Sequence, residues 1–171
     1  MIVTDASVLI ALAKLRRLGL LQQVYGEVLV GPIVRGEVID QGKAVGATEV
    51  VAVEEAIRDG WIRVARPTQG ERKATHSLLT RSGLDGGESE SMALARSRKC
   101  MLVVDDKEAR ALAAAAGIEH IGTAGVLLEA YFDGHLGLEE LEEAVRDLSS
   151  VLWLAPAVAI EILRKARGMK K

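Results

Sequence analysis

The chain has 171 residues, of which 49% are hydrophobic and 27% charged. This composition is typical of a globular protein and excludes a disordered one. The formal net charge of −2 gives no global sign of nucleic-acid binding, so any such role must rest on local groups of residues. The single cysteine, Cys100, excludes an internal disulfide. Because no signal peptide and no run of ~20 apolar residues is visible, we expect a cytoplasmic protein.

Short apolar segments alternate with segments of helical periodicity. The apolar segments predict strands at 1–4, 27–30, 61–64, 101–104 and 119–121. Helices are predicted at 7–21, from Pro32 onward, and at 48–59, 71–82, 88–99, 107–116, 123–132, 138–148 and 156–167. This alternation predicts an α/β fold with a mostly parallel sheet and right-handed crossovers. We see no repeat, linker or domain boundary, so a single domain over 1–171 is expected.

Carboxylates follow the predicted strands or open the predicted helices. Asp5 follows the first strand, and Asp105 and Asp106 follow the fourth; Glu37 lies about one helical turn beyond the second strand, and Glu88 opens the helix 88–99. Because parallel strands end at one edge of a sheet, these acids should converge there. Converging carboxylates need protons or a hard cation to coexist, so the pattern indicates a site for Mg²⁺ or Mn²⁺.

A simpler interpretation exists for each acid taken alone. An acid at the start of a helix can be merely a cap that accepts hydrogen bonds from free backbone N–H groups. Asp5, Glu88 and Asp106 all occupy such positions. Their joint placement at one sheet edge is what favours a metal site.

The four acidic segments, taken in chain order, resemble the motifs of PIN domains, a superfamily of metal-dependent ribonucleases. The segments are Asp5 to Ile10, Val30 to Val38, Glu88 to Ala95 and Val103 to Lys107. The resemblance implies a three-layer α/β/α sandwich around a central, mostly parallel sheet of four to five strands. It covers 1–135 as the core and leaves 136–171 as an appended C-terminal helical extension. It is strongest to a branch with a Gly-Glu-x-Glu third motif and a doubled aspartate in the fourth.

Carried onto this chain, the resemblance implies that one or two divalent ions bind four acids: Asp5, Glu37, Glu88 and Asp106. These four would also be the catalytic residues. Ser7 matches a position where a small polar group supports the first acid.

Two of these positions leave alternatives open. The chain has glutamate at position 88, where the commoner toxin pattern has aspartate, so Glu90 or Asp85 could share or take that role. Residues two apart on a helix face different ways, which makes Glu88 and Glu90 unequal candidates. In the doubled aspartate, Asp106 is favoured as the ligand and Asp105 is its alternate.

The implied function is that of a metal-dependent endoribonuclease which hydrolyses RNA phosphodiester bonds. The resemblance to VapC-type toxins further implies the toxin of a type II toxin–antitoxin pair, held silent by a small antitoxin protein and forming a homodimer. A catalytically silent PIN-like module that binds nucleic acid or protein is the alternative. A different doubly wound phosphoryl-transfer or receiver-like domain is less favoured, because the chain contains no phosphate-binding loop of the G-x-x-x-x-G-K type.

Overall fold

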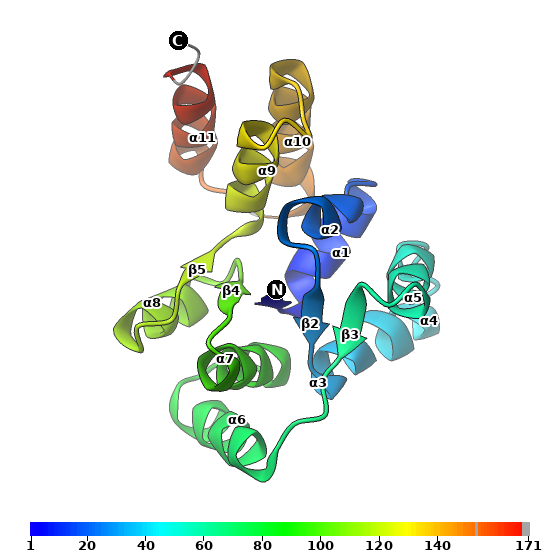
Figure 1. Cartoon of the computed structure of the whole chain (residues 1–171), viewed down its shortest axis with the longest axis vertical. Helices are drawn as coiled ribbons and strands as arrows, with labels where there is room; N and C mark the ends of the chain where they lie inside the picture. The colour runs from blue at the N-terminus through cyan, green and yellow to red at the C-terminus, as the bar shows by residue number, and fades with distance from the viewer. Residues whose placement is uncertain (153, 169–171) are drawn as a thin grey trace.

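The protein is built around a five-stranded parallel sheet, seen in a computed structural model that describes residues 1–152 and 154–168 (Figure 1). Trp153 and the last three residues of the predicted 136–171 extension lie outside the described residues. The strand order is β3-β2-β1-β4-β5. The strands are β1 (Ile2–Thr4), β2 (Val28–Val30), β3 (Ile62–Val64), β4 (Met101–Val103) and β5 (His120–Ile121). The predicted strand positions and the parallel sheet are confirmed.

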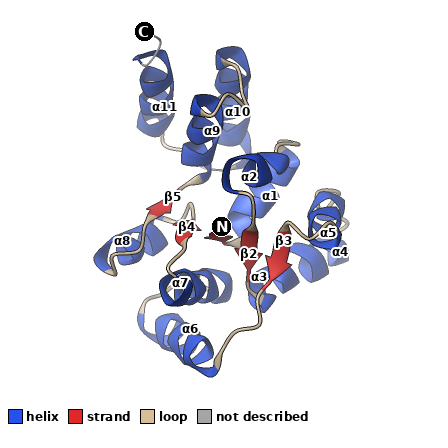
Figure 2. Ribbon diagram, viewed as in Figure 1, coloured by secondary structure: helices blue, strands red, loops and turns tan. Residues whose placement is uncertain are grey.

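Helices cover both faces of this sheet (Figure 2). The N-terminal helices are α1 (Ala6–Lys14), α2 (Gly19–Tyr25), α3 (Pro32–Arg35), the π-helical turn η1 (Gly36–Gln41), α4 (Gly42–Ala44) and α5 (Val50–Arg58). The remaining helices are α6 (Gln69–Arg81), α7 (Gly86–Arg98), α8 (Lys107–Ala115), α9 (Thr123–Phe132), α10 (Leu138–Val151) and α11 (Pro156–Gly168).

Alternate residues of each strand point to opposite faces, which divides the core in two. Ile2, Val28 and Val103 pack against α1, α2, α5 and the C-terminal helices. Val3 and Leu102 pack against α7 and α8 on the other face. Because both faces are covered, the central strands β1, β2 and β4 are buried and mostly apolar along their length, whereas the edge strand β3 exposes Arg63. The three-layer α/β/α sandwich is therefore confirmed.

The predicted helix 7–21 is broken in the structure into α1 and α2. Arg16 adopts a left-handed backbone conformation with φ of 56°. Its N–H donates to the Ala13 carbonyl oxygen, and the Arg17 N–H donates to the Leu12 carbonyl oxygen. This pair of hydrogen bonds is a Schellman motif, which ends a helix. Glycine usually occupies that left-handed position, and the arginine here concealed the break from the sequence.

A buried carboxylate joins α7 to the start of α3. Glu90, only 4% exposed, accepts hydrogen bonds from the backbone N–H groups of Ile33 (2.8 Å) and Val34 (3.4 Å). Gly31 precedes α3 and has no side chain with which to cap it. Glu90 supplies that cap from another helix, and it occupies the space beside Gly31 that a side chain would need.

A second buried carboxylate joins α6 to α7. Glu71 is 3% exposed and completes a capping box with Thr68 at the start of α6. The Arg98 guanidinium donates to both of its carboxylate oxygens, at 2.9 and 3.3 Å. This pairing with Arg98 lowers the pKa of Glu71 from 4.5 to about 2, against the opposing effect of burial.

None of the helices within the described residues combines the length and the apolar character needed to cross a bilayer.

Replacing Gly31 by alanine should destabilise the protein. The new methyl group would lie 1.9 Å from Glu90 Oε2, whereas the backbone φ of −83° suits any residue. We expect the free energy of unfolding to fall by about 1 to 3 kcal/mol, measured by urea denaturation. Gly19→Ala is the control, because a Cβ there meets no atom within 4 Å. An unchanged midpoint for Gly31→Ala would contradict the contact with Glu90.

The ion pair of Glu71 with Arg98 should make stability depend on pH. Because the folded pKa of Glu71 lies below its ordinary value of 4.5, the carboxylate stabilises the fold above pH 4.5 and loses that effect as pH falls toward 2. Glu71→Gln should therefore cost about 2 to 3 kcal/mol at pH 7, and the cost should shrink below pH 4.5. Glu55→Gln, which changes an exposed acid, is the control. A cost independent of pH would refute the role of the charge.

Candidate active site

The carboxyl edge of the sheet brings the predicted acids into one region. Asp5 directly follows β1, and Asp105 follows the neighbouring strand β4 by two residues. Glu37 lies in η1, which follows β2 through α3, and Glu88 lies in the first turn of α7. α7 packs against β1, β4 and α3, so its first turn lies among the ends of these elements. The expected convergence of parallel strand ends thus occurs here.

Asp5 is the most buried of these acids, with 3% of its surface exposed. Its Oδ1 accepts a hydrogen bond from the Val8 N–H at 3.1 Å, and the Ser7 hydroxyl lies 3.0 Å from each carboxylate oxygen. The pKa of Asp5 is raised to about 7, chiefly by burial and also by the charges of Asp105 and Glu88, against the opposing hydrogen bonds from Val8 and Ser7. Asp5 is therefore a carboxylate that a nearby positive charge would stabilise.

Glu37 reaches the start of α7 from η1. Burial raises the pKa of Glu37, the charges of Asp85, Glu90 and Glu88 add to this, and the Gly87 N–H opposes it. A Cβ at Gly87 would lie 2.4 Å from Glu37 Oε2. Glycine at position 87 is therefore what allows the Glu37 carboxylate to approach the α7 backbone.

Glu88 links the other acids electrostatically. Its carboxylate accepts a hydrogen bond from the Asp85 N–H at 3.0 Å, and the Asp85 carboxylate accepts one from the Glu88 N–H at 2.8 Å. Burial raises the pKa of Glu88, and the charges of Asp85, Asp106 and Glu108 also raise it. Since Glu88 in turn raises the pKa of Asp5 and Glu37, all four acids inferred as ligands interact through it.

The two consecutive aspartates take different partners. Asp106 Oδ1 accepts a hydrogen bond from the Ala109 N–H at 2.8 Å and so caps α8. Asp105 accepts two hydrogen bonds from Thr123, one from its N–H at 2.8 Å and one from its hydroxyl at 2.5 Å. The negative charge of Asp105 raises the pKa of Asp5, whereas the negative charge of Asp106 raises the pKa of Glu88. Both aspartates thus border the group of acids, on different sides.

The remaining alternates are held by backbone groups. Glu90 is directed at the first turn of α3, where it caps Ile33 and Val34, and Asp85 caps α7. Glu88 and Glu90 therefore face different neighbours, as their spacing on the helix predicted. Thr123 and Gly87 were not identified from the sequence. Gly122-Thr123 at a helix start is a visible signal, but nothing in the sequence pairs it with an aspartate 18 residues earlier.

The donor set is chemically suited to a hard divalent cation. Every candidate offers carboxylate oxygens, which Mg²⁺ and Mn²⁺ prefer. Among the described residues, no three acids, histidines or cysteines have side chains placed closely enough together to hold a metal ion. Glu88 and Asp106 instead direct their carboxylates at backbone N–H groups of the helix starts.

Comparison with known proteins agrees with this arrangement. A family model described as a PIN domain matches residues 1–168. No curated protein and no solved structure matches the chain. PIN domains are generally nucleases and typically use divalent metal ions. Since the matched family covers nearly the whole chain, and the parallel sheet with acids at its carboxyl edge is the fold expected from the motifs, the chain belongs to the PIN-domain family.

Proposed function

We propose that this protein is a metal-dependent endoribonuclease that hydrolyses phosphodiester bonds in RNA. The observation that carries the proposal is the mutual repulsion of the four acids. The charge of Glu88 raises the pKa of Asp5 and of Glu37, and the charge of Asp106 raises the pKa of Glu88. Keeping such a group ionised at neutral pH costs free energy, and a divalent cation offsets that cost. A nuclease of this family gains its cation site from such a group of acids.

The four acids would hold the cation, with Asp105 and Glu90 as alternates. A bound Mg²⁺ or Mn²⁺ would supply a water of lowered pKa and stabilise the charge on the phosphoryl oxygens. Ser7 holds the Asp5 carboxylate in one orientation through its hydroxyl. Glu88 is partly exposed and bound by a single backbone N–H, so turning it toward a cation breaks only one cap.

Two cations near these acids suit the substrate's charge. Lys107 opens α8 directly after Asp106, and Arg110 follows at the end of the first turn. Among the described residues neither takes part in an ion pair with an acid, so both remain available for phosphate oxygens. A guanidinium and an ammonium at this position would orient the RNA backbone without reading its sequence.

The similarity of the four motifs to VapC-type toxins supports a more specific role. We assign the protein as the toxin of a type II toxin–antitoxin pair in the cytoplasm, with a small antitoxin protein as partner and a homodimer as its functional form. The nuclease core would span 1–135, and the helical extension from 136 onward would complete a single domain, since α9 packs against both α10 and α11.

Two observations favour a second candidate, a catalytically silent PIN-like module that binds nucleic acid or protein. Glu88 and Asp106 both use their carboxylates to cap helices, and glutamate replaces the commoner aspartate at position 88. In such a module these acids would serve the fold alone.

Cleavage of RNA decides between the two candidates. The purified chain, incubated with single-stranded and hairpin RNAs, should cleave them with Mn²⁺ and leave them intact with EDTA. Asp5→Asn and Glu88→Gln should each lower the rate by about 100-fold or more, because each removes a charge that holds the cation. Glu139→Gln, at an exposed acid in the first turn of α10, is the matched control and should stay within about threefold of wild type. Background cleavage in every lane would favour the silent module.

Thermal unfolding should identify the fourth ligand without relying on activity. A cation that binds only the folded state raises the melting temperature, by about 5 to 10 °C at a hundredfold excess over its Kd. Wild type and Asp105→Asn should show this rise with Mn²⁺, whereas Asp106→Asn should lose most of it. The opposite pattern would transfer the ligand role to Asp105. No rise in wild type, with no heat of Mn²⁺ binding in calorimetry, would contradict the metal site.

A further inference from the structure

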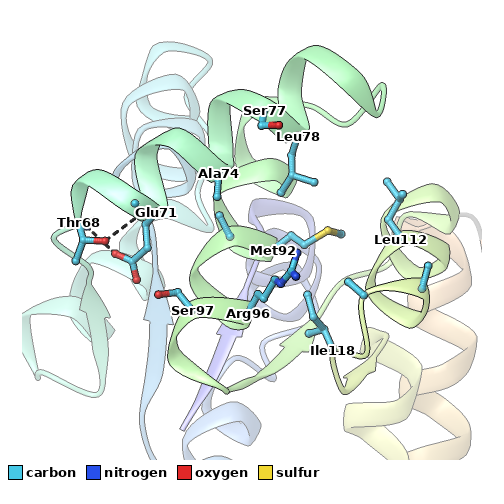
Figure 3. Close-up of a pocket in the computed structure, with 14 residues that line it drawn as sticks. Thr68, Glu71, Ala74, Ser77, Leu78, Met92, Arg96, Ser97, Leu112 and Ile118 are labelled. Carbon is cyan, nitrogen blue, oxygen red and sulfur yellow. Dashed lines mark hydrogen bonds between the residues drawn. The ribbon is translucent and has the colours of Figure 1, made fainter.

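A hollow in the molecule is formed by α6, α7 and α8, and none of the four acids inferred as ligands lines it. It has a volume of about 720 Å³. Met92 of α7 lies on its floor, with Leu78 of α6 on one side and Leu112 and Ile118 on the other (Figure 3). Ala93, the next residue of α7, also lines it. We call this hollow the α7 groove.

The α7 groove has the size and lining of a small-molecule site. Ligand pockets span about 300 to 1,000 Å³ and are mostly apolar, with a few polar groups that orient the ligand. Small side chains such as Ala74 and Ala115 leave the space between the helices open. Met92 and Ala93 are 2% and 3% exposed, so the floor is a packed apolar surface and not a loose gap.

The charges in the groove favour an anion. Glu71 lies in the wall, but its carboxylate is already paired with the Arg98 guanidinium. Arg96 extends into the groove beside Met92 (Figure 3) and, among the described residues, it has no ion-pair partner. An adjoining hollow of about 330 Å³ shares Arg96 and adds Lys99, a second cation without an ion-pair partner in the described part of the chain. The adjoining hollow also contains the acid Glu119, whereas Arg96 is, of the residues that the structure describes, the one cation that lines the α7 groove itself, where the only acid, Glu71, is already paired. The groove therefore presents one guanidinium, that of Arg96, beside an apolar surface.

We propose that the α7 groove binds a small apolar carboxylate, with its hydrocarbon body against Leu78, Met92 and Leu112 and its carboxylate on Arg96. A guanidinium pairs with a carboxylate through two parallel hydrogen bonds, which fixes the orientation of the ligand. The apolar lining accepts the hydrocarbon body through burial. A cationic amphiphile of the same length would meet Arg96 as a like charge. This site is independent of the proposed nuclease function.

Decanoate tests the proposal as a defined probe. Isothermal titration calorimetry on the full chain at pH 7.5 should show saturable binding of decanoate and no binding of decyltrimethylammonium. Arg96→Gln should weaken decanoate binding about five- to tenfold, because the charge-assisted hydrogen bonds are lost. Ala74→Phe, at an exposed position of α6 that lines the groove, should fill the space and abolish binding.

Two matched variants control for charge and for bulk outside the groove. Arg81→Gln removes an exposed cation at the end of α6, and Ala114→Phe adds the same ring to an exposed position of α8; neither residue lines the groove. Both should bind decanoate like wild type, and all four variants should keep the wild-type circular dichroism spectrum. If wild type does not bind decanoate, the proposal is overturned. A groove that instead accepts a protein segment would give that result. Binding that survives Ala74→Phe, or equal binding of the cationic amphiphile, also overturns it.

Discussion

Parallel pairing of β1 with both of its neighbours is the constraint on which the rest of the molecule depends. Ile2 pairs with Val28 on one side and with Met101 on the other, so three strands end at the same level. Whatever follows those strands must share one edge of the sheet. An acid or the start of a helix follows each of these strand ends. The acids therefore lie close enough for their negative charges to repel one another. The repulsion at this edge is built in by the topology.

Helix starts partly offset that repulsion. Asp5, Asp106 and Glu90 each accept hydrogen bonds from N–H groups in the first turn of a helix, at α1, α8 and α3 respectively. The positive end of each helix dipole thus faces the acidic edge. The choice between cap and ligand, which the sequence left open, is therefore not an exclusive one. Asp5 and Asp106 cap helices in this structure, and under the proposed function they would also supply oxygens to the cation.

Much of this arrangement could be predicted from the sequence, because local periodicity and strand ends carry it. The positions of the strands and the placement of Asp5, Glu37 and Glu88 at one edge follow from short apolar runs and the parallel sheet rule. Contacts between distant residues could not be predicted. Nothing local links Asp105 to Thr123, because their contact depends on the pairing of β5, which precedes Thr123, with β4. The break at Arg16 could not be predicted for a different reason. Its left-handed backbone conformation is one that glycine usually adopts, so an arginine gave no sign of a helix end.

The contact of Gly31 with Glu90 has a consequence for the history of the family. The two positions lie 59 residues apart, yet the space beside one is filled by the side chain of the other. A larger residue at position 31 is compatible only with a shorter one at position 90, and a shorter residue at 90 leaves the start of α3 without its cap. A change at either position therefore alters what the other can do, and we expect the two residue types to covary among relatives that start α3 in this way.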